Sequence, residues 1–89
     1  MNLSFCYLLD KKAVIKTSEE DSGIRVTDTY LKVINSYDIM PIDYLEEQCL
    51  MLKFVAHKYN INPSLIYPIS KKDYMRNSVE NNTETIRII

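Results

Sequence analysis

The sequence has one glycine, one histidine and no tryptophan, and its two cysteines lie far apart. A phosphate-binding loop needs several glycines, whereas Gly23 is the only one here. A histidine-based metal centre or acid–base pair needs more than His57. Cys6 and Cys49 fit neither a zinc-ligand nor a redox spacing. The sequence therefore predicts a protein with no enzymatic activity, no metal and no cofactor.

The chain also lacks an excess of charge and a long apolar segment. Its 11 basic and 12 acidic residues give a formal charge of −1, which argues against nucleic acid as the partner. The apolar N-terminal run ends at residues 10–12, which is too short for a signal peptide. No stretch approaches the ~18 apolar residues of a membrane span. We therefore expect a cytoplasmic protein with no membrane contact and two reduced cysteines in or near its core.

The remaining pattern predicts one α+β domain over residues 1–89. Alternating apolar residues at 3–9 predict a strand, and shorter strands follow at 13–17 and 24–27. They form a small antiparallel sheet, either an N-terminal hairpin or a three-stranded meander, packed against two helices. The first helix is expected at 30–37 and the longer one at about 41–59. Residues 77–83 are predicted to be a mobile loop, and 85–89 either an edge strand or a tail.

The long helix has the strongest local signals. Pro41 suits its first turn, and Asp43 with Glu46 has capping-box spacing. Residues stepping by four and three predict one buried seam, which consists of Leu45, Cys49, Leu52, Ala56 and Tyr59. Tyr44, Met51 and Val55 widen this seam on one side. Gln48 falls inside this apolar arc, so it either finds a buried partner or marks the rim of the packed face.

Two large apolar residues of the long helix fall outside the seam. Leu50 and Phe54 are i and i+4 neighbours among charged residues that include Glu47 and His57. Two interpretations remain open. Either other parts of the chain cover this side of the helix, or Leu50, Phe54, His57 and Glu47 form a surface that binds a partner or a second copy.

A short segment after the long helix suggests a different function. Residues 60–67, Asn-Ile-Asn-Pro-Ser-Leu-Ile-Tyr, resemble the turn and the start of the recognition helix in transposase-type helix-turn-helix proteins. The resemblance implies that Ser64, Tyr67, Lys71 and Lys72 contact DNA. Pro68 departs from that pattern, because it interrupts the recognition helix.

These observations predict a small interaction or regulatory protein that acts by binding a larger protein, with a homodimer as a further form. Ile, Asn, Lys and Tyr are frequent, and AT-rich codons encode them. This usage suggests an AT-rich genome such as that of a phage, a mobile element or a low-GC bacterium. Together with the small size and the missing catalytic motifs, it leads us to expect a phage or mobile-element inhibitor of a host system. The alternative is a helix-turn-helix-like DNA-binding regulator that uses residues 60–72.

Overall fold

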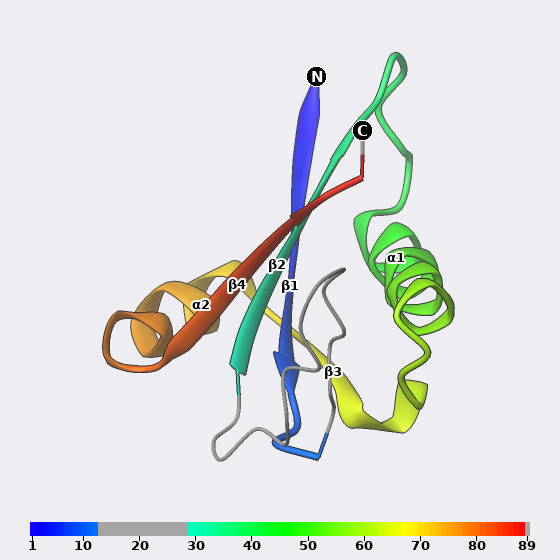
Figure 1. Ribbon diagram of the computed structural model, residues 1–89. Helices are drawn as coiled ribbons and strands as arrows, with labels where there is room; N and C mark the ends of the chain where they lie inside the picture. The colour runs from blue at the N-terminus through cyan, green and yellow to red at the C-terminus, as the bar shows by residue number, and fades with distance from the viewer. Residues whose placement is uncertain (13–28, 89) are drawn as a thin grey trace.

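A computed structural model describes residues 1–12 and 29–88 of the chain. One four-stranded sheet lies between two helices, α1 and α2 (Figure 1). The strands are β1 (Asn2–Leu9), β2 (Thr29–Ser36), β3 (Ile66–Ile69) and β4 (Asn82–Arg87). The helices are α1 (Tyr44–Lys58) and α2 (Lys71–Asn77), with 3-10 turns η1 (Pro63–Leu65) and η2 (Ser78–Glu80). The α+β class is confirmed, and the strands predicted at 13–17 and 24–27 lie outside the described residues.

The sheet is mixed, with the strand order β3-β1-β2-β4. β1 is antiparallel to both β2 and β3, whereas β4 runs parallel to β2. The expectation of a purely antiparallel sheet is therefore wrong at β4. A parallel pair needs a long crossover, and α1, β3 and α2 together provide it. The C-terminal segment does join the sheet as an edge strand, although it starts earlier than predicted.

The helix predicted at 30–37 is wrong, because this segment forms β2, a central strand of the sheet. Tyr30, Val33 and Ile34 match a helical stripe by spacing, but β2 pairs along its whole length with β1. A short apolar run does not distinguish a helix from a strand that is covered on both faces. The buried Leu31 and Val33, at alternate positions, carried the strand signal.

The main core lies between α1 and one face of the sheet. Phe5, Tyr7 and Leu9 alternate along β1, and each is fully buried. In the β1–β2 register, Phe5 lies opposite Val33 and Tyr7 opposite Leu31, so these side chains share a face. The core also includes Val55, Ala56, Ile61, Ile66 and Ile86.

The long helix begins at Tyr44, later than the predicted start at Pro41. Asp43 is its N-cap, and its Oδ1 accepts hydrogen bonds from the backbone N–H groups of Leu45 at 3.0 Å and Glu46 at 3.2 Å. The predicted seam is partly wrong, because Leu45 and Cys49 are exposed. The rest of the predicted side is confirmed, because Gln48, Val55 and Ala56 are buried. Leu52 and Tyr59 are partly buried and pack against the core.

The opposite face of the sheet is covered by the short helix α2. Ser70 caps α2, since its hydroxyl oxygen accepts a hydrogen bond from the Asp73 N–H at 3.0 Å. Tyr74 is the buried residue of α2. Its ring contacts the Tyr30 ring edge-on, with 6.2 Å between the ring centroids. The loop expected at 77–83 instead contains the end of α2, η2 and the start of β4. Among the described residues, no helix is long and apolar enough to cross a membrane.

Candidate functional site

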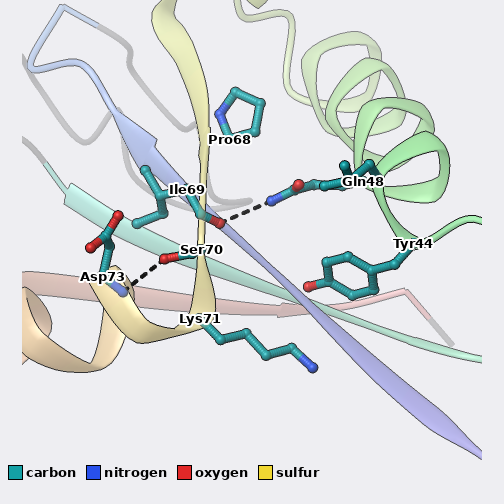
Figure 2. Close-up of a pocket in the computed structure, with 8 residues that line it drawn as sticks. Tyr44, Gln48, Pro68, Ile69, Ser70, Lys71 and Asp73 are labelled. Atoms are coloured by element: carbon teal, nitrogen blue, oxygen red, sulfur yellow. Dashed lines mark hydrogen bonds between the residues drawn. The ribbon is translucent and has the colours of Figure 1, made fainter.

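An open cleft of about 660 Å³ lies where β3 separates from β1 (Figure 2). Tyr44, Leu45 and Gln48 of α1 form one side of it. Residues 68–71 and Asp73, at the junction of β3 and α2, form the other. The cleft therefore brings together two segments that are far apart in the sequence.

Gln48, which lines this cleft, joins α1 to the sheet by two side-chain hydrogen bonds. Its side chain is 5% exposed, and its Nε2 donates to the carbonyl oxygens of Cys6 and Ile69, both at 3.0 Å. Cys6 and Ile69 are the last residue pair of the β1–β3 ladder, so the amide closes the ladder at the point where the two strands diverge. The predicted alternative of a buried partner for Gln48 is confirmed, and both partners are backbone groups of the sheet.

Two tyrosines attach α1 to β1 beside Gln48. The Tyr7 hydroxyl donates to the main-chain oxygen of Gln48, and burial raises the pKa of this phenol. The Tyr44 hydroxyl donates to the Ser4 carbonyl at 2.6 Å, and its ring stacks on Phe5 at 5.0 Å. These hydrogen bonds hold the first turns of α1 against β1 and so fix one side of the cleft.

The charged residues that line the cleft are Lys71 and Asp73. The Lys71 amine lies over the Tyr44 ring, 5.2 Å from its centroid, as a cation–π contact. Across residues 1–12 and 29–88, no group of His, Cys, Asp and Glu side chains is placed to hold a metal ion. Leu45 and Pro68 add apolar side chains to the lining of the cleft.

Beside the cleft lies a surface that the sequence reasoning missed. We name it the apolar lobe, and it consists of Ile39, Met40, Ile42 and Leu45. Ile39 is 86% exposed, Ile42 105% and Leu45 69%. Its residues belong to the segment that joins β2 to α1 and to the first turn of α1, and Figure 1 shows the course of this segment beside the sheet. Four large apolar residues within seven positions, at a break in periodicity, could have indicated this surface. The sequence pattern instead predicts that Leu45 is buried in the seam of α1.

The surroundings of the apolar lobe are acidic. No lysine or arginine occurs between Lys32 and Lys53. The four acidic residues in that interval are Asp38, Asp43, Glu46 and Glu47. A second hollow of about 490 Å³ is lined by Pro41 and Ile42 together with the last three of these acids. The lobe and this hollow therefore combine exposed apolar area with negative charge.

The four residues predicted to bind a partner lie together on α1. Leu50 is 46% exposed and Phe54 41%, so neither is covered internally. The Lys58 amine lies 5.9 Å from the centroid of the Phe54 ring, and His57 is exposed one turn from it. Glu47 accepts a hydrogen bond from the Tyr37 hydroxyl at 2.8 Å. Their role in binding stays a prediction.

The residues predicted for DNA contact do not lie on a recognition helix. Asn62 caps the turn after α1 as its position suggests, but this turn is η1, and it leads directly into β3. Tyr67 therefore lies in a strand, opposite Leu8 of β1. Ser64 lies in η1, and Lys71 and Lys72 begin α2. Sheet pairing of residues 66–69 displaced the helix that the local sequence resembles.

Comparisons of this chain with protein-family models, with curated proteins and with solved structures found no significant match.

Proposed function

We propose that this protein is a non-enzymatic binding protein that acts by inserting its apolar lobe into a groove on a larger protein. The observation that carries the proposal is the exposure of Ile39, Ile42 and Leu45 within one short segment. Single exposed apolar residues are common on protein surfaces, whereas contiguous ones are typical of interaction sites.

The energetics of these side chains support a binding role. Complete burial of an isoleucine or leucine side chain stabilises a complex by about 1.5 to 3 kcal/mol. Asp43, at the centre of this segment, is held in place as the N-cap of α1. The cap limits the conformational entropy that the adjacent Ile42 loses on binding. The proposal thus assigns most of the affinity to three apolar side chains.

The charges around the lobe indicate the chemistry of the partner. Because Asp38, Asp43 and Glu46 flank the apolar residues, the complementary surface is an apolar groove with lysine or arginine at its rim. The same charges disfavour nucleic acid, whose phosphates would be repelled. The host system that the partner would belong to, the phage or mobile-element origin and the cytoplasmic location stay predictions.

A paired set of variants tests the proposal. The first, Ile39→Ser with Ile42→Ser, removes the centre of the lobe. The matched control, Met75→Ser with Val79→Ser, removes two comparably exposed apolar residues near α2. The wild type and both variants are immobilised and incubated with a lysate of cells that naturally contain this protein. The bound proteins are then quantified by mass spectrometry. We expect the lobe variant to lose a protein that the wild type and the control retain, by about tenfold or more.

Retention of the same proteins by both variants contradicts the proposal, provided that circular dichroism shows both to be folded. Retention on heparin that falls steeply with salt would favour the DNA-binding alternative instead, because such binding releases counterions.

A further inference from the structure

The side of α1 that faces away from the sheet carries an ordered set of charged and apolar side chains. This outer stripe consists of Glu46, Glu47, Leu50, Phe54, His57 and Lys58. At about 100° and 1.5 Å per residue, Leu50 and Phe54 lie side by side at its centre. The two acids lie about one turn before Leu50, and the two basic residues about one turn after Phe54.

Lys53, which is exposed at the edge of the outer stripe, would lie near the Lys53 of an antiparallel copy and oppose the pairing there. The six residues of the stripe itself follow the order acid, apolar, apolar, base, and this order matches its own reverse, with acids opposite bases. When a copy of the helix lies antiparallel to the first, Leu50 of the copy lies at the height of Phe54, and Phe54 of the copy lies at the height of Leu50. Glu46 then lies within about 1.5 Å of the height of His57 of the copy, and on the same flank. Glu47 likewise lies within about 1.5 Å of the height of Lys58 of the copy, and these two residues share the other flank. A parallel copy would instead place acid against acid and base against base.

We propose that the outer stripe binds a second copy of this chain in an antiparallel, two-fold arrangement whose axis passes between Leu50 and Phe54. The two-fold axis repeats each contact, so one Leu50–Phe54 contact and one Glu47–Lys58 ion pair occur twice. The antiparallel helix dipoles favour the same arrangement. One helix from each copy buries less than the ~800 Å² per partner of a standard interface, so the dissociation constant is expected on the order of 10 to 100 µM.

The first test measures the mass of the protein alone by sedimentation equilibrium, from about 10 µM to about 1 mM, concentrations that bracket this dissociation constant. We expect the mass to rise from the chain's 10.5 kDa towards twice that value. Phe54→Ala should weaken association by about tenfold or more. The matched control, Met75→Ala, truncates an exposed apolar residue of α2 and should leave association unchanged.

The second test addresses the antiparallel register. Lys58→Glu places like charges together and should weaken association, whereas Lys72→Glu makes the same charge change on α2 and should not. Adding Glu47→Lys to Lys58→Glu exchanges the charges and should restore association. Should Glu47→Lys lower the melting temperature through the lost Tyr37 hydrogen bond, Lys58→Glu and its control decide the register alone.

A mass that stays at one chain up to about 1 mM overturns the proposal, and the outer stripe would then have to bind a different protein. Equal effects of Phe54→Ala and Met75→Ala, or of Lys58→Glu and Lys72→Glu, overturn it as well. All measurements use the isolated protein, so their outcome is independent of capture by the apolar lobe.

Discussion

The two faces of the sheet differ in how they are covered. The face towards α1 is closed by fully buried side chains, including Phe5, Tyr7 and Leu31. The face towards α2 is covered by a seven-residue helix. Beneath α2 lies a cavity of about 110 Å³, lined in part by Cys6, Lys32 and Tyr74. We infer that the α1 face supplies most of the stability, because buried apolar contact is the dominant favourable term in folding.

The largest expected effect compares two positions of β2 that point to opposite faces. Leu31→Ala removes a fully buried side chain on the α1 face and should lower the free energy of unfolding by about 2 to 5 kcal/mol. Ile34→Ala removes a partly buried side chain on the α2 face, and should cost about 1 kcal/mol. Urea unfolding measures both. Equal losses would show that the two faces contribute alike.

A smaller effect is expected from the polar contact within the α1 face. Gln48→Leu keeps the helix and its apolar packing but leaves the carbonyls of Cys6 and Ile69 without their side-chain donor. The free energy of unfolding should fall by about 1 to 3 kcal/mol. The exposed neighbour provides the control, since Cys49→Ser should change it by less than about 0.5 kcal/mol. An unchanged value for Gln48→Leu would show that the amide is not required to close the β1–β3 ladder.

The smallest expected effect is a local opening of the α2 face, which the reactivity of the two cysteines can detect. Cys49 is exposed on α1, whereas Cys6 is buried and burial raises the pKa of its thiol. A thiol reagent should therefore modify Cys49 at once and Cys6 slowly in the folded protein.

If the α2 face opens by itself, Tyr74→Leu should accelerate modification of Cys6 at denaturant concentrations far below global unfolding. A Cys6 rate that follows global unfolding in every variant would show that both faces open as one unit. Cys6→Ser and Cys49→Ser chains assign each rate to its residue.

The candidate surfaces were predicted to different degrees. Leu50 and Phe54 were identified from the sequence, because residues on a single helix share a face at fixed intervals. Ile39 and Ile42 were missed, since they lie in a loop, where no periodicity relates side chains to a surface. The cleft could not be predicted, because Gln48 and Ile69 meet only through the pairing of β1 with β3.

The sequence by itself determined the elements whose signals are local. These are the alternation of β1, the Asp43 cap of α1 and the Ser70 cap of α2, each set by neighbours within a few residues. Only the tertiary structure decided that residues 29–36 form a strand and that β4 is parallel to β2. It also decided that Leu45 and Cys49, which the sequence placed in the buried seam of α1, are exposed. Strand pairing and helix packing depend on partners distant in the chain, and their contact energies exceed local preferences.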